Sequence, residues 1–392
     1  MSVQQLISAG LLLALLTQAF LVMLFALLLQ RKRLELDHWP VEPDGGWPAL
    51  EVLLCLRGAD EALPRLLQAL AGQRYAGTWH LRVVVDSPAD PAWELLETWM
   101  ARHDVAWHSL ERKSLQQVPS RGSLKCAALL QGCEALRSDT QLVVLLDADA
   151  ALSPDGLQCL ARACWQPGVG VVSGNRWYAP RGMAVLDWSR AVWGAGAFAM
   201  MTLLRIPWGG MLALRRSVVD HGAWNDLLQH GLCEDTGLLE PLRQMGLRYD
   251  FRPELIVVDR SASPGPLTLL HWITRQLLTA RLHHPAWPLV MLHGLSTGLL
   301  LVAAIVLGAW WAVVIYELGC VLLLLAIEAL VLERWPHNGV GWISGLLLGQ
   351  LIDACATVQA QFQRRLEWRG VDYAVTFDPR GVRLLLDRNQ NY

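Results

Sequence analysis

The stretch Leu142-Val143-Val144-Leu145-Leu146-Asp147-Ala148-Asp149 decides how the rest of the chain is interpreted. Its five leading apolar residues predict a strand that is buried on both faces, as in a parallel sheet. Two carboxylates follow at once, at the end of a strand where open α/β sheets bind their ligands. Carboxylate oxygens suit Mg²⁺ or Mn²⁺, which in turn can hold a diphosphate. Asp147 and Asp149 are therefore candidate metal ligands, although strand-end aspartates are also common without such a role.

Three more short apolar segments predict further strands of the same sheet, and these are Glu51–Leu56, Leu81–Val85 and Val169–Val172. Segments with a helical period of apolar residues lie between them. Because strands alternate with helices along residues 48–262, we expect a doubly wound α/β domain there.

Acidic residues occupy two more positions at which chemistry is plausible. Asp86 follows the predicted strand 81–85, and Asp90 comes four residues later. An aspartate there can accept a hydrogen bond from a nucleobase, or it can simply close an Asx-turn. Glu234 and Asp235 stand at a predicted helix start, where the helix dipole favours acids. They are also candidates for a general base that takes a proton from a hydroxyl.

Basic residues supply candidate partners for a diphosphate. Lys125 lies in Gly122-Ser123-Leu124-Lys125, and Arg275 and Arg281 lie on a predicted amphipathic segment. Guanidinium groups hold phosphate well, but arginines beside a membrane are also expected from topology alone. The glycines of Trp208-Gly209-Gly210-Met211 either allow the backbone to approach a ligand closely or only form a loop.

The bulk composition indicates a membrane protein. Hydrophobic residues make up 53% of the chain and charged residues 17%, against about 25% charged in soluble domains. Residues 1–30 contain the apolar run Leu6–Leu29, which is long enough to cross a bilayer and is followed by Arg31, Lys32 and Arg33. Positive charge stays cytoplasmic. We therefore predict an anchor at 1–30, a linker at 31–47 and a cytoplasmic domain at 48–262.

The C-terminal third returns to the membrane. Residues 263–285 form an interfacial amphipathic segment, and 286–332 are apolar enough for two spans. For residues 341–362 we favour a re-entrant or interfacial segment over a full span, since a full span would put the arginines of the tail 363–392 outside.

The formal net charge of −2, without long charged runs, argues against nucleic acid as a partner. The eight cysteines form no CxxC pair, so neither a zinc site nor a disulfide framework is indicated.

The order of these motifs resembles family 2 glycosyltransferases, and within them the ceramide glucosyltransferase-like group. The likeness covers about residues 50–375 and rests on four loose motifs in a specific order. They are Leu56-Arg57-Gly58-Ala59-Asp60, Val85-Asp86-Ser87 through Asp90-Pro91-Ala92, Ser123-Leu124-Lys125, and Trp368-Arg369-Gly370 with Tyr373.

The resemblance implies a GT-A type, Rossmann-like nucleotide-sugar domain inserted between transmembrane helices. It implies a UDP-sugar donor, a lipid acceptor such as ceramide or diacylglycerol, and an inverting, metal-assisted transfer of one hexose. Asp235 would be the base beside Glu234, and Asp147 and Asp149 would hold Mn²⁺ or Mg²⁺. The donor would be bound by Arg57, Asp60, Asp86, Asp90, Lys125, Asp147, Arg275 and Arg281.

One departure from the family pattern bears on activity. The family has a (Q/R)xxRW motif on its interfacial helix, whereas Arg275-Gln276-Leu277-Leu278-Thr279 replaces its Arg-Trp by Leu278-Thr279. Arg281, further along, is a candidate substitute. Two other functions stay open: a processive polysaccharide synthase, for which the spans are few, and a catalytically silent membrane binding protein, against which the retained acids argue.

Overall fold

The computed structural model describes residues 1–37, 42–43, 45–103, 109–117, 121–182, 184–263, 265–332, 335, 341–377 and 384–388. The chain forms two compact units. We call the first the membrane unit, which comprises Met1–Asp37, Arg176–Leu204 and Val258–Gln363. We call the second the sheet unit, which comprises His38–Asn175, Arg205–Val257 and Arg364–Tyr392. Each unit is described by itself.

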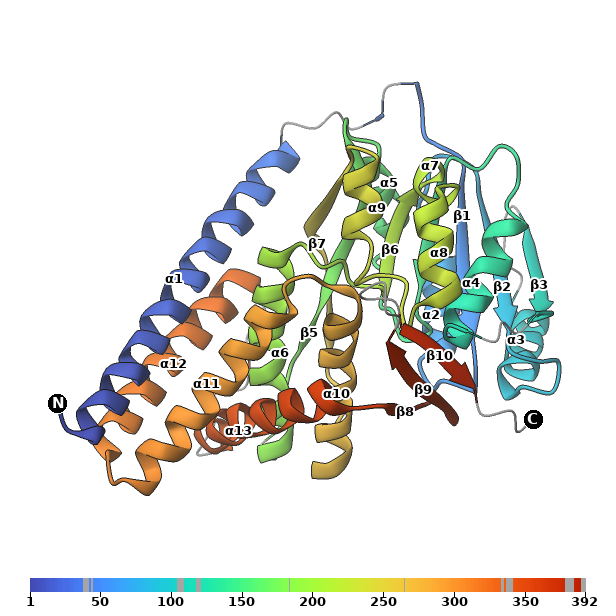
Figure 1. The fold of residues 1–392 in the computed structure, drawn as a ribbon. Helices are drawn as coiled ribbons and strands as arrows, with labels where there is room; N and C mark the ends of the chain where they lie inside the picture. The colour runs from blue at the N-terminus through green and yellow to red at the C-terminus, as the bar shows by residue number, and fades with distance from the viewer. Residues whose placement is uncertain are drawn as a thin grey trace. The chain divides into compact units, whose positions relative to one another are not determined.

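A seven-stranded sheet, in the order β3-β2-β1-β4-β6-β5-β7, forms the centre of the sheet unit (Figure 1). β1 pairs in parallel with β2 and β4, and β2 pairs in parallel with β3. β6 runs antiparallel to β4 and β5. The four predicted strands are confirmed. The bounds are β1 Leu50–Leu56, β2 Trp79–Val85, β3 Leu110–Ser114, β4 Leu142–Leu146, β5 Val169–Tyr178, β6 Met211–Arg215 and β7 Arg248–Asp259.

Helices cover both faces of this sheet, because successive strand residues point to opposite sides. Val52 and Leu54 of β1 pack in a cluster with the buried leucines of α2, whereas Leu53 packs with Trp224 of α8. The predicted doubly wound α/β arrangement is therefore confirmed. The helices are α2 Leu63–Ala71, α3 Pro91–Arg102, α4 Leu124–Glu134, α5 Gly156–Cys164, α7 Arg216–Val219, α8 Gly222–His230 and α9 Leu239–Gln244.

The C-terminal tail adds a small antiparallel sheet to the sheet unit, in the order β10-β9-β8. Its strands are β8 Arg365–Trp368, β9 Val371–Phe377 and β10 Leu384–Arg388. Leu366, Val371 and Tyr373 are buried, so the hairpin of β8 and β9 is packed on one face.

The described residues of the membrane unit form helices and their connections, apart from the ends of β5 and β7. Four of its helices, α1, α11, α12 and α13, are long and apolar enough to cross a membrane, as the composition predicted. α13 covers the predicted segment 341–362 as one unbroken helix of 22 residues. The bounds are α1 Val3–Asp37, α6 Val185–Leu204, α10 Pro266–His283, α11 Trp287–Val306, α12 Trp310–Val331 and α13 Gly341–Phe362.

One segment of the predicted domain 48–262 packs elsewhere than the sequence pattern indicated. Arg176–Leu204, which includes α6, clusters with the apolar helices and not with the sheet. Within the membrane unit α6 packs against α13, and the indole Nε1 of Trp193 donates to Asp353 Oδ1 at 2.8 Å. Asp353, an acid in an apolar helix, therefore has a hydrogen-bond donor. Acids in such helices are expected to have partners, because a carboxylate is costly to place in lipid.

Gly174 offers a test of how closely the strands of the sheet unit approach. A Cβ at this position of β5 would lie 1.8 Å from the carbonyl oxygen of Leu255 in β7. We predict that Gly174→Ala lowers the free energy of unfolding by about 2 kcal/mol or more, because the strands must separate. The measurement is the thermal midpoint of the detergent-purified protein, which should fall by roughly 5 °C.

Gly222→Ala is the matched control for this substitution. Gly222 begins α8, and a Cβ there meets no atom within 4 Å. Its thermal midpoint should be unchanged or slightly raised. Equal midpoints for the two variants would contradict the described strand contact.

Candidate active site

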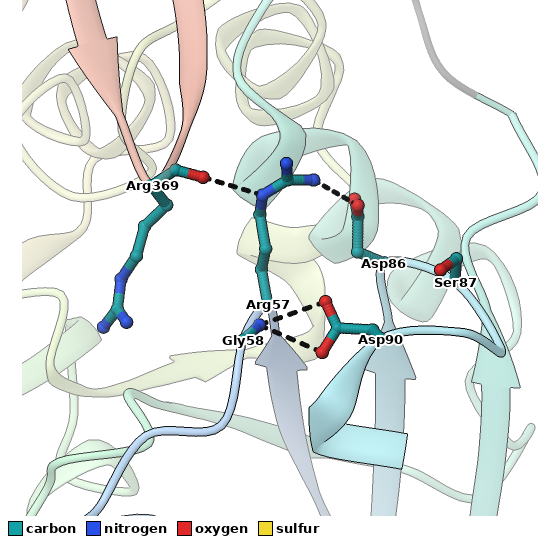
Figure 2. Close-up of a pocket in the computed structure, with 6 residues that line it drawn as sticks. All are labelled: Arg57, Gly58, Asp86, Ser87, Asp90 and Arg369. Carbon is teal, nitrogen blue, oxygen red and sulfur yellow. Dashed lines mark hydrogen bonds and ion pairs between the residues drawn. The ribbon is translucent and has the colours of Figure 1, made fainter. Parts of the chain in front are cut away.

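A pocket of about 440 Å³ opens where β1 and β2 end, and it is lined by Arg57, Gly58, Asp86, Ser87, Asp90 and Arg369 (Figure 2). Because β1 and β2 are parallel, the residues that follow them meet at one edge of the sheet. The volume falls in the range of small-ligand sites, about 300–1,000 Å³. The structure therefore brings three predicted donor-site residues, Arg57, Asp86 and Asp90, to one pocket.

Arg57 is held between two acceptors in this pocket. Its Nη1 pairs with Asp86 Oδ2, and its Nε donates to the carbonyl oxygen of Arg369 at 2.9 Å. The guanidinium lies between the two in Figure 2. Arg369 was not among the predicted site residues, although its motif contributed to the family resemblance.

Asp90 and Asp60 shape the loops around the pocket. Asp90 caps α3 by accepting from the Ala92 amide at 2.8 Å, and both of its oxygens accept from the Gly58 amide at 3.0 Å. Asp60 accepts from the Ala62 amide and pairs with the Arg369 guanidinium, each at 3.0 Å. Both carboxylates are thus engaged with the protein as well as lying at or beside the pocket.

The second group of site residues is an acid cluster centred on Lys125. The Nζ atom of Lys125 lies 2.7 Å from Asp147 Oδ1 and 2.6 Å from Glu234 Oε1. Ser123 positions this lysine by capping α4, since its hydroxyl accepts from the Cys126 amide at 3.1 Å. Asp147 directly follows β4, as predicted, so the cluster belongs to the same sheet edge as the pocket.

Charge in the cluster is unbalanced, because one lysine faces several carboxylates. Burial lowers the pKa of Lys125, but Asp147 and Glu234 outweigh it and hold that pKa well above its usual value. Burial raises the pKa of Glu234, and Asp235 and Asp147 raise it further against the opposing effect of Lys125. The pKa of Lys125 is thus raised by the neighbouring carboxylates, and that of Glu234 is raised mainly by burial and further by the same negative charge.

Asp235 is held rigidly beside this cluster. Its Oδ2 accepts from the Gly209 amide at 2.8 Å, and its Oδ1 accepts from the amide and hydroxyl of Thr236 at 2.6 and 2.9 Å. The side chain of Glu234 is only 1% exposed, whereas Asp235 is half-buried. Asp235 is therefore the one of the two that a substrate can reach.

The structure corrects the local setting of both acids. Glu234 and Asp235 do not begin a helix, because α9 starts at Leu239 and the acids lie in the preceding turns. The glycines of the predicted loop 208–211 explain their position. A Cβ on Gly209 would lie 2.4 Å from Glu234 Oε1 and 2.7 Å from Asp235 Oδ2. Gly209 thus makes room for these carboxylates.

Asp147 and Asp149 offer carboxylate oxygens, which are the ligands that hard divalent cations prefer. They flank a tight turn in which the Ala150 amide donates to the Asp147 carbonyl at 2.9 Å. Among the described residues, no group of three or more His, Cys, Asp or Glu side chains could hold a metal. Mg²⁺ and similar ions take one or two carboxylates and complete their shell with water and phosphate oxygens. The donor set suits that chemistry and not a full protein cage.

The two remaining predicted donor-site residues, Arg275 and Arg281, lie on α10 in the membrane unit. The Nη1 of Arg281 donates to the carbonyls of Ala360 and Gln363 at 2.7 and 3.2 Å, at the end of α13. Leu278, which replaces the arginine of the family motif, is completely buried. Leu278 therefore contributes to the buried packing of α10.

Comparison with solved structures shows the fold. A mannosyltransferase from Pyrobaculum calidifontis, solved with GDP-mannose and Mn²⁺, matches with a TM-score of 0.56 and 17% identity, covering 91% of this chain and 99% of that one. Glucosyl-3-phosphoglycerate synthase from Mycobacterium tuberculosis matches with a TM-score of 0.38 and 18% identity, covering 60% and 79%. The predicted GT-A type fold is confirmed, and helices long and apolar enough to span a membrane accompany it.

Comparison with curated proteins found no match. The profile of glycosyl transferase family 21 matches residues 13–380, which is almost the whole sequence. The chain therefore belongs to glycosyl transferase family 21.

Proposed function

We propose that this protein transfers a single hexose from a UDP-sugar to the hydroxyl of a membrane lipid of the ceramide or diacylglycerol type. The observation that carries the proposal is the pairing of two features at one sheet edge. One is a nucleotide-sized pocket lined by Arg57 and Asp86, and the other is the acid cluster around Lys125, with Asp235 fixed beside it.

The donor would lie along this edge. Asp86 and Arg57 offer an acceptor and a cation for the nucleoside, while Lys125 offers its ammonium to the diphosphate. Asp147 and Asp149 would hold Mn²⁺ or Mg²⁺, which when bound neutralises charge on the departing diphosphate. The similar mannosyltransferase was solved with a nucleotide sugar and Mn²⁺, which is consistent with this choice of cofactor.

Asp235 is the proposed general base. The acceptor oxygen forms a bond to the anomeric carbon from the side opposite the diphosphate, and that carbon's bond to the diphosphate oxygen breaks. UDP leaves with the electron pair, and the hydroxyl proton passes to the Asp235 carboxylate. The hydrogen bonds from Gly209 and Thr236 orient the carboxylate before the substrate arrives. Such a single displacement inverts the anomeric configuration and needs no protein nucleophile.

The choice of a lipid acceptor rests on the membrane unit. Within the described part of the chain, four helices are apolar enough to cross a bilayer. A transferase anchored in this way works where lipid hydroxyls are concentrated. Positive charge after the first span supports a cytoplasmic sheet unit.

Asp149→Asn tests the proposed metal site. We expect UDP affinity in the presence of Mn²⁺ to fall about tenfold or more, because one carboxylate ligand is lost. UDP affinity measured with EDTA should be unchanged. Isothermal titration of the detergent-purified variant with UDP, with and without Mn²⁺, gives both values.

Asp139→Asn is the control for this charge change, since Asp139 is an exposed carboxylate paired only weakly with Arg137 at 3.3 Å. It should bind UDP as the wild type does. An Asp149→Asn protein with full Mn²⁺-dependent UDP affinity would remove the basis for this metal site.

Asp235→Asn tests the proposed base. The amide keeps the shape of the carboxylate but cannot take the proton, so we expect kcat to fall by about 10²–10⁴-fold. The Kd for UDP should stay within about threefold, because Asp235 does not line the nucleotide pocket. Transfer of radiolabelled sugar into the lipid fraction measures kcat, and UDP titration measures Kd.

Asp220→Asn serves as the matched control. Asp220 is an exposed carboxylate directly after α7, and it pairs with Arg216 at the start of that helix. Its kcat should equal that of the wild type. Comparable turnover by the Asp235→Asn and Asp220→Asn proteins would argue decisively against Asp235 as the base.

A further inference from the structure

The turn between β8 and β9 has a backbone conformation that few residues adopt. Trp368 pairs with Val371, so Arg369 and Gly370 form a two-residue hairpin loop. Both have positive φ, 53° and 72°, as in the type I′ turns that suit hairpins. This geometry directs the Arg369 carbonyl at the pocket wall, where it accepts from Arg57 Nε (Figure 2).

The turn holds two residues of the β1 end at once. Its carbonyl binds Arg57, and the Arg369 guanidinium pairs with Asp60 at 3.0 Å. Arg57 therefore has an acceptor on each side, the Asp86 carboxylate and the tail carbonyl. A guanidinium held from both sides keeps one orientation when a ligand enters, which lowers the entropy lost on binding.

The same hairpin also reaches the helix that carries Lys125. The Tyr373 side chain is 2% exposed, and its hydroxyl accepts from the Leu124 amide at 3.3 Å. Leu124 is the first residue of α4, directly before Lys125. The amides at a helix start lack acceptors within the helix. The Tyr373 hydroxyl is the acceptor for one of these amides, that of Leu124. One short segment thus contacts both the pocket and the first residue of the helix that carries Lys125.

We infer that the C-terminal hairpin is a working part of the donor site, in which the Arg369–Gly370 turn positions Arg57 and Tyr373 positions the start of α4. The inference rests on the proposed nucleotide-sugar transfer. It makes these three tail residues positioning residues, which act through Arg57 and Lys125, for a nucleoside diphosphate ligand.

Gly370→Val tests this role, with Gly246→Val as a matched control. Both glycines have positive φ, 72° and 64°, and a Cβ on either meets no atom within 4 Å. The two variants therefore carry similar backbone strain and should lose thermal stability to a similar degree. Gly246 follows α9 and is not among the residues that line the pocket. Titration with UDP and Mn²⁺ should show Kd raised at least about tenfold for Gly370→Val alone.

Two further variants separate positioning from folding. Gly370→Asn should keep the wild-type Kd, because asparagine tolerates positive φ. Tyr373→Phe retains the buried ring and loses the acceptor for Leu124, so Kd should rise about fivefold. It also provides the test if Gly370→Val does not fold.

An unchanged UDP affinity in both Gly370→Val and Tyr373→Phe would overturn the inference, as would an equal loss in Gly246→Val. A wild-type protein that binds no UDP in the presence of Mn²⁺ would instead overturn the proposed function, and the inference with it.

Discussion

The ion pairs of Lys125 with Asp147 and Glu234 are the constraint on which the rest of the sheet unit depends. A carboxylate as buried as that of Glu234, which is 1% exposed, is tolerated only when it is paired, since an uncompensated buried charge costs several kcal/mol. The pairs tie the start of α4 to the end of β4 and to the turns before α9. Gly209 is required at the same place because any side chain would collide with Glu234 and Asp235. The backbone at Gly209 is thus constrained by the carboxylates that lie against it.

This arrangement also explains why the cluster suits a diphosphate with a cation. Several carboxylates face one ammonium. Asp147 and Glu234 raise the pKa of Lys125, whereas the pKa of Glu234 is raised first by burial and then by Asp235 and Asp147. A divalent cation offsets the negative charge of these carboxylates, and its remaining coordination sites are available to phosphate oxygens. Glu234 is the buried partner of Lys125, whereas Asp235 is half-buried and is the acid that we propose as the base.

Much of the fold was predictable, because buried strands such as 142–146 are continuous apolar runs and the ends of parallel strands must meet at one edge. Asp86 and Asp147 were found from this rule alone. The pairing of Lys125 with Glu234 was not predictable, since 109 sequence positions separate them and no period links them. Arg369 was missed because its contribution to the pocket is a main-chain carbonyl. The only local sequence signal is the glycine of Arg369-Gly370, which is typical of a hairpin turn. The packing of α6 with the apolar helices was also missed, because its segment lies between two strands.

The central claim is that a family 21 member with this site uses a lipid as its sugar acceptor. The most direct measurement is UDP release by the detergent-purified protein, given UDP-glucose or UDP-galactose with Mn²⁺, in the presence and absence of ceramide or diacylglycerol. We expect that release requires one of the lipids and stops when a chelator removes the metal. Release that proceeds equally without lipid or with chelator would contradict it, as would the absence of release with every combination.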